Sequence, residues 1–204
     1  NDLGGHSRFP GLVERVSLPD AGRVYLHDFR DNLMACTSRG QIFEVDRQFR
    51  FRNRTGVPVS GGRRVIFTKT ETDLLMAAGG PIVQLRTKDT ELLSEDAPNA
   101  TYIQWIDGYT IAAEVNSGRF YHSNPGEPKV WEPLDTFAAD SSPDTISNLL
   151  ITPFREIMIG GNNSLEQFER VNSGDAPFQR RWSNGDGVML PYGILFADNA
   201  VWSM

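Results

Sequence analysis

The sequence has little cysteine and few long apolar runs. Its single cysteine, Cys36, can neither form a disulfide within the chain nor build a zinc site alone. The apolar segment around it, Leu33–Ser38, is typical of a buried strand, so we expect an inert core thiol. No apolar run approaches the roughly 20 residues that a membrane helix needs, so no membrane span is predicted.

Catalytic and cofactor-binding motifs are also missing. There is no Gly-x-Ser-x-Gly elbow, no Walker pattern and no His-Glu-x-x-His sequence. The three histidines, His6, His27 and His122, lack a metal-ligand partner at helical or hairpin spacing. We assign each a structural or solvated role, with His27 near a central axis or at a loop edge. The sequence thus predicts no catalytic residue, no cofactor and no metal site.

Two partial motif matches fail on inspection. Ser123–Gly126 followed by Trp131 is loosely similar to the repeated box of sialidase propellers, but Pro125 stands where the box has Asp. The segment Asp140–Asp144 suggests a calcium loop but lacks the glycine that such a loop needs for its bend. We interpret it as a solvated loop with an Asp-based turn.

Helical periodicity is absent as well, since no helical period of apolar residues persists for three turns. With 19 glycines and 12 prolines, the composition favours short strands joined by tight turns. The net charge of −6 opposes general attraction to nucleic acid but leaves room for a local basic patch. The chain lacks an initiator methionine and stops inside the apolar segment Ala200–Trp202, so we expect an excerpt of a longer protein.

What the sequence does contain is a repeated pattern of strands and turns. The second strand of each repeat is centred on Leu33, Leu74, Thr110, Ile157 or Ala200, with gaps of 41, 36, 47 and 43 residues. A period of roughly 42 residues with about four strands per unit is typical of β-propeller blades. Second strands buried between neighbouring blades would explain these continuous apolar runs. An all-β sandwich with coincidental spacing is the alternative.

We therefore predict an all-β chain, a β-propeller with four visible four-stranded blades and part of another. Residues 1–22 would form an N-terminal loop, with one strand at Leu12–Leu18. The blades would occupy approximately residues 23–56, 57–98, 99–140, 141–186 and, incompletely, 187–204.

An arginine-rich segment, Arg47–Arg54, is the most unusual charge feature. As one continuous strand it would alternate arginines on one face with Phe49, Phe51 and Asn53 on the other. It could contact DNA phosphates or an acidic partner. Alternatively, it is an outermost strand whose phenylalanines pack inward while its arginines guard an exposed edge. The candidate basic strip, including two arginines just beyond the segment, comprises Arg47, Arg50, Arg52, Arg54, Arg63 and Arg64.

Long polar loops are the second candidate surface, because long loops often carry binding residues. We expect one at Gly126–Asp144 and another at Gly174–Pro177, with Trp131 and Phe137 fixing the first to its blade. The residues predicted to contact a partner are Glu127, Lys129, Asp140, Asp144 and Asp175.

Several residues in this region occur in the order of a known family. They are Tyr121, Ser123, Pro125–Gly126–Glu127, Trp131, Leu134, Phe137–Ala138 and Ser142–Pro143–Asp144. The segment resembles the phage stabilisation protein family, the packaged-DNA stabilisation or tail-hub proteins of short-tailed phages such as P22. The following segment, Arg155–Phe168, also resembles the family. In contrast, Ala139–Asp140–Ser141 departs from the family's usual pattern of an acidic residue and a glycine.

This resemblance implies a phage tail protein of the virion, made in the host cytoplasm and without enzymatic activity. It implies a homo-oligomeric ring, a hexamer, that lies below the portal close to the packaged DNA. Portal and other tail proteins would be its partners, and the tail needle and tailspikes would attach to it. One alternative is a propeller domain that binds glycan or protein in a receptor-binding particle. Another is a propeller glycosidase or lyase, which would need carboxylates converging at one mouth.

Overall fold

The computed structural model describes residues 15–19, 22–86, 88–139, 144–171 and 176–204. Within these ranges every regular element is a β-strand, as the sequence predicts. No helix in the described ranges is long and apolar enough to cross a membrane. The described part of the expected N-terminal strand, residues 15–18, is not in a strand.

The strands form four antiparallel four-stranded sheets and one two-stranded sheet. The first sheet contains β1 (Val24–Phe29), β2 (Asn32–Thr37), β3 (Ile42–Val45) and β4 (Phe51–Asn53). The second contains β5 (Ile66–Lys69), β6 (Leu74–Ala77), β7 (Val83–Leu85) and β8 (Thr90–Leu92). The third contains β9 (Ala100–Ile106), β10 (Tyr109–Glu114), β11 (Arg119–Asn124) and β12 (Glu127–Ala138).

The fourth sheet contains β13 (Asn148–Ile151), β14 (Glu156–Gly160), β15 (Leu165–Arg170) and β16 (Phe178–Asn184). The two-stranded sheet contains β17 (Ile194–Ala197) and β18 (Ala200–Ser203). In every sheet the strands follow each other in sequence order, because each is joined to the next by a short hairpin connection. We refer to the sheets as blades 1 to 5.

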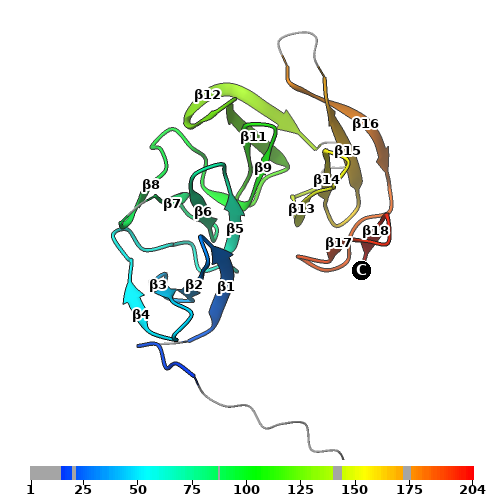
Figure 1. The fold of residues 1–204 in the computed structure, drawn as a ribbon. Coiled ribbons are helices and arrows are strands. Elements are labelled where there is room, and N and C mark those ends of the chain that lie inside the picture. Colours follow the sequence, from blue (N-terminus) through cyan, green and yellow to red (C-terminus); the bar gives the residue numbers. More distant parts are fainter. Residues whose placement is uncertain (1–14, 20–21, 87, 140–143, 172–175) are drawn as a thin grey trace, which may run out of the picture.

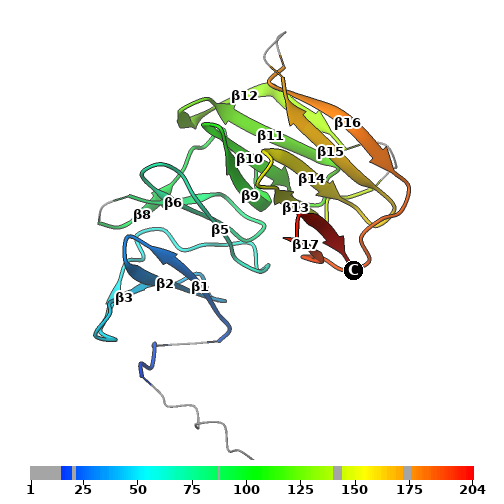
Figure 2. The ribbon, with the colours of Figure 1, turned by 45° about the vertical axis from the view of Figure 1, so that its right-hand side comes forward.

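The blades are arranged in an open arc around a common axis (Figure 1). The first strand of each blade lies nearest the axis, and the fourth strand of each complete blade lies at the outer edge. The view turned by 45° shows the sheets following one another as separate twisted layers (Figure 2). The architecture confirms the prediction of all-β, four-stranded blades with a partial blade at the end.

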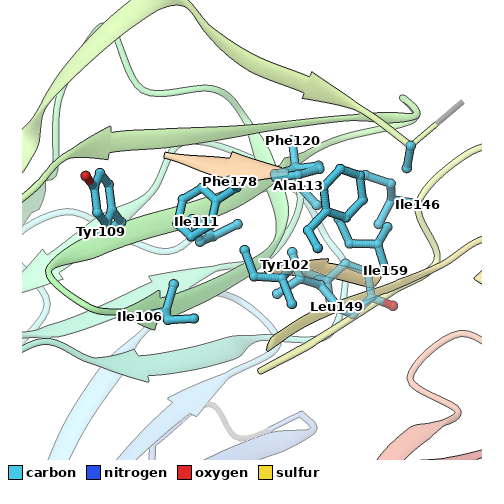
Figure 3. Packing of buried hydrophobic residues seen from close by; sticks show 13 residues of the cluster. Tyr102, Ile106, Tyr109, Ile111, Ala113, Phe120, Ile146, Leu149, Ile159 and Phe178 are labelled. Carbon is cyan, nitrogen blue, oxygen red and sulfur yellow. The ribbon is translucent and has the colours of Figure 1, made fainter. Parts of the chain in front are cut away.

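The hydrophobic core lies between blades rather than inside any one of them. Three buried clusters join blade 1 to blade 2, blade 2 to blade 3, and blade 3 to blade 4. Figure 3 shows the third cluster, where Ile111 and Phe120 of blade 3 lie beside Ile159 and Phe178 of blade 4. A single sheet cannot bury both its faces, so each blade depends on its neighbours.

The second strands of the inner blades carry apolar runs because neighbouring blades cover both of their faces. Every side chain of β6 is buried, and so are all but the last of β10. Cys36 in β2 is fully buried, and this burial raises the pKa of its thiol to about 12. The prediction that Cys36 is a core thiol is thereby confirmed. In contrast, β18 of the partial blade is largely exposed.

Candidate interaction surfaces

The β11–β12 hairpin occupies the place where the sequence predicts a long polar loop. Its turn contains Gly126 in the left-handed region, with a φ of 76°, and β12 then runs for 12 residues. The expectation of a loop over Gly126–Asp144 is therefore wrong for most of its length. Pro128 and Pro133 lie within this strand, and an edge strand tolerates proline because its outward groups need no ladder partner.

The two aromatic residues of β12 do attach it to the core, as predicted. Trp131 is 5% exposed and donates its indole N–H to the carbonyl oxygen of Pro128 at 2.9 Å. It packs in the cluster between blades 2 and 3, whereas Phe137 stacks on Phe120 in the cluster between blades 3 and 4.

A register irregularity allows one strand to serve both neighbouring blades. Trp131 and Phe137 are six residues apart, so a regular strand would place them on the same face. Ser123 pairs with Trp131 while Tyr121 pairs with Thr136, so β12 contains extra residues between these pairs. This bulge changes which face the later residues occupy, and the two aromatic rings consequently point to opposite blades.

The charged residues predicted to contact a partner have different environments. Glu127 is exposed at the hairpin turn. Lys129 forms an ion pair with Glu91 of blade 2, with 2.7 Å between Nζ and Oε1. Asp144 accepts hydrogen bonds from the backbone N–H groups of Thr145 and Asn163 and so supports the β14–β15 turn. Asp140 and Asp175 lie outside the described residues, and the contact role of all five stays a prediction.

The arginine-rich segment is only partly a strand, which corrects the expectation of a continuous strand over Arg47–Arg54. Phe49 has a φ of 60° and lies in a tight turn, held by the Asp46 carboxylate, which accepts from the backbone N–H groups of Gln48 and Arg50. The strand begins at Phe51, whose ring meets that of Phe43 edge-on at 5.7 Å. An Asp side chain that bonds to nearby backbone favours a turn over an extended chain.

Most of the arginine charge in this segment is compensated locally. Arg47 pairs with Asp31, Arg50 with Asp46, and Arg54 with Glu44. On β4, Arg52 stands directly opposite Glu44 of β3. The edge-guarding interpretation fits only in part, because the arginines are paired at an outer edge but Phe49 and Phe51 are 50% and 43% exposed rather than packed inward. Contact of this segment with DNA stays a prediction.

Arg63 and Arg64 are not part of the same surface. They precede β5, the innermost strand of blade 2, whereas β4 is the outermost strand of blade 1. The Arg63 guanidinium donates to the Asn116 side-chain oxygen of blade 3 at 2.5 Å. The Arg64 guanidinium lies over the ring of Tyr192 at 5.0 Å. The predicted strip therefore divides into an outer group of four arginines and an axial pair.

Ion pairs connect neighbouring blades at the ends of their strands. Asp28 of blade 1 pairs with Lys69 of blade 2 at 2.5 Å, which lowers the pKa of the Asp28 carboxyl. Asp107, in the β9–β10 turn of blade 3, binds both Arg155 and Arg170 of blade 4. Both of these carboxylates are thus matched by cations. The ion pairs of Asp107 could not be predicted from the sequence. An Asp–Gly pair predicts a hairpin turn, but it does not predict which residues the Asp side chain contacts.

The histidines of the described chain are packed against aromatic rings. His27 stacks on Phe67 at 5.3 Å, near the axis as predicted, and its burial lowers its pKa. His122 is buried beside Tyr109 and Phe178. Among the described residues, no group of three or more His, Cys, Asp or Glu side chains is placed to hold a metal.

Blades built from four antiparallel strands, stacked through apolar layers around an axis, define the chain as a β-propeller. The chain belongs to the phage stabilisation family, described as Bacteriophage P22 Gp10, beta-propeller, which matches residues 17–201. It is therefore a structural protein of a phage particle. None of the curated protein sequences compared with this chain matches it.

Solved structures with the same fold are distant in sequence. BamB from Moraxella catarrhalis has a TM-score of 0.55 at 12% identity, and the alignment covers 88% of this chain and 54% of BamB. A putative 6-phosphogluconolactonase from Bacteroides uniformis has a TM-score of 0.58 at 8% identity, and the alignment covers 86% of this chain and 60% of the other protein. YCF48 from Cyanidioschyzon merolae has a TM-score of 0.59 at 9% identity, and the alignment covers 92% of this chain and 69% of YCF48. At such identities the likeness shows the fold alone, and the chain spans only part of each of these proteins.

Proposed function

We propose that this protein is a tail hub without enzymatic activity, which assembles as a ring below the portal and helps to retain packaged DNA. The family match over residues 17–201 carries this proposal. A ring of this kind would also provide the surface to which the tail needle and tailspikes attach. In this role the chain must be a stiff support, and the ion pairs between blades favour such stiffness.

The outer face of the β11–β12 hairpin is the contact surface that we propose. It carries Leu134, which is 90% exposed, next to the charged residues Glu132 and Asp135. A large, nearly bare apolar side chain in the bulge of an edge strand suits a protein contact, in which an apolar anchor is surrounded by polar residues. Glu127 lies at the tip of the same hairpin.

The assembly of the protein with its portal tests this proposal. We expect the purified protein mixed with portal rings to co-sediment as a ring-shaped complex that is visible by electron microscopy. A protein that remains monomeric in the presence of portal, and instead binds a glycan on an array, would contradict the hub role.

A surface substitution tests the proposed contact. Leu134→Lys should weaken portal-dependent assembly by tenfold or more, because losing one central apolar anchor commonly costs about 2 kcal/mol. Met189→Lys is the matched control, since Met189 is 84% exposed but lies away from the hairpin. If both variants assembled normally, another surface would mediate assembly.

A further inference from the structure

A groove runs along the axis between the inner strands of blades 1 and 2. Its volume is about 450 Å³, and its lining consists of Val24–His27 of β1 together with Arg64–Phe67 at β5. Consecutive residues of each strand line it, so it follows the strand edges that face the axis. The inner strands β5 and β9 pack closely, as do β9 and β13, whereas β1 stands farther from β5 and leaves this space.

One end of the groove is cationic. Arg64 lines it, and Arg63 precedes Arg64 in the chain. Neither guanidinium forms an ion pair with a carboxylate in the described residues, although ten other basic side chains do. The Arg64 guanidinium in the groove thus lacks a carboxylate counter-charge among the described residues, and a bound anion would supply one.

Side chains from other blades support Arg64 at this end. The Tyr192 ring, which precedes β17, lies beneath the Arg64 guanidinium and 5.1 Å from the ring of Tyr102 in β9. The Tyr102 hydroxyl donates to the carbonyl oxygen of Ser147. These contacts fix Tyr192 across the axis and hold Arg64 in position, which reduces the entropy lost when a ligand binds.

The walls and the far end of the groove differ from the cationic end. Tyr25, His27 and Phe67 supply partly exposed aromatic surface along the walls. At the far end the Asp28–Lys69 pair neutralises itself, so it adds no net charge. The segment that begins beside Arg64 and ends at Lys69, the last residue of β5, is roughly 15 Å long. The groove therefore has one charged end and an apolar, aromatic body.

We propose that this groove binds a small organic oxyanion of about mononucleotide size. Its phosphate group would lie against Arg64, and its planar or apolar body would pack along Tyr25 and Phe67. Guanidinium groups match the geometry of phosphate oxygens, and pockets for small ligands commonly have volumes of about 300–1,000 Å³. The inference is independent of the hub role, because it concerns the axis rather than the outer face.

Calorimetric titration of the intact chain with three probes tests the proposal. AMP carries both the anion and the planar body, adenosine has only the body, and inorganic phosphate has only the anion. We expect AMP to bind more tightly than either of the others. Arg64→Gln should weaken AMP binding by about tenfold to a hundredfold, because a hydrogen bond to a charged group contributes about 1.5–3 kcal/mol.

Arg52→Gln provides the matched control, since it removes an arginine of the outer edge strand far from the axis. It should leave AMP binding unchanged. The thermal midpoint of each variant without ligand reports whether it is folded. The proposal is wrong if millimolar AMP gives no binding heat, if Arg64→Gln binds AMP like the parent chain, or if Arg52→Gln loses as much affinity as Arg64→Gln.

Discussion

Trp131 illustrates how a single side chain ties an outer strand to the core. It sits on the edge strand β12 yet is 5% exposed, because its ring reaches the cluster between blades 2 and 3. Its indole N–H is satisfied by the carbonyl oxygen of Pro128, so burial leaves no unpaired donor. The residue also belongs to the sequence pattern that resembles the phage stabilisation family.

Replacing this side chain should therefore be costly. We expect Trp131→Ala to lower the free energy of unfolding by about 3–5 kcal/mol, the usual cost of truncating a buried large aromatic residue. Trp202→Ala is the control, because Trp202 is 56% exposed, and its effect should stay below about 1 kcal/mol. Urea unfolding followed by circular dichroism measures both values. Similar losses for the two variants would contradict the packing described for Trp131.

Cys36 provides a second prediction at this scale. Burial raises the pKa of its thiol from 9.0 to about 12, so the native protein should react with Ellman's reagent at pH 8 only as it unfolds. Between pH 9 and pH 12 the unfolded chain loses its thiol proton while the folded chain retains it. Stability from this group is therefore fully present below pH 9 and declines as the pH rises towards 12. Rapid labelling of the native protein at pH 8 would contradict this environment.

At the scale of elements, the repeat could be predicted from sequence because the second strands of the inner blades are covered on both faces. The apolar runs Leu74–Ala77 and Ile157–Ile159 are direct consequences of that burial. The long β12 could not be predicted in the same way, since Pro128 and Pro133 are loop signals unless the strand is known to be at an edge. Nor could Arg64 be placed beside Tyr192, because 128 residues separate them and only the arc brings them together.

The ion pairs between blades differ in expected energy. Asp107→Asn should lower the free energy of unfolding by about 1–2 kcal/mol, because the Asp107 side chain is only 9% exposed and binds two arginines. Asparagine also tolerates the φ of 53° at this position, so the substitution removes the charge without straining the turn.

The Glu91–Lys129 pair offers the comparison. Both of its side chains are roughly half exposed, so Glu91→Gln should change the free energy of unfolding by no more than about 0.5 kcal/mol. Chemical unfolding at low and high salt measures both effects. An equal loss in the two variants would show that burial at Asp107 does not strengthen its ion pairs.

At the scale of the whole molecule, the chain is an arc whose two end blades each have one neighbour. On blade 5, Leu195 and Trp202 pair across the sheet and are 46% and 56% exposed, whereas Ile194 packs towards blade 4. On blade 1, Val24 and Leu26 are similarly exposed. Stability in such an array is a sum over neighbouring pairs, so the ends contribute least.

Hydrogen exchange should follow this gradient. We expect the amides of β17 and β18 to exchange fastest among the strands and those of β10 to be the most protected. Mass spectrometry of peptides from the native protein measures the order directly. Uniform protection across all blades would show instead that the arc opens as one cooperative unit.

The two prolines of β12 have a consequence for the protein at high concentration. An outer strand of 12 residues is long enough to recruit a strand from a neighbouring molecule and begin aggregation. Pro128 and Pro133 lack the N–H group, so the donor ladder along this edge is interrupted twice. This edge should therefore resist sheet fusion between copies of the chain even at high protein concentration.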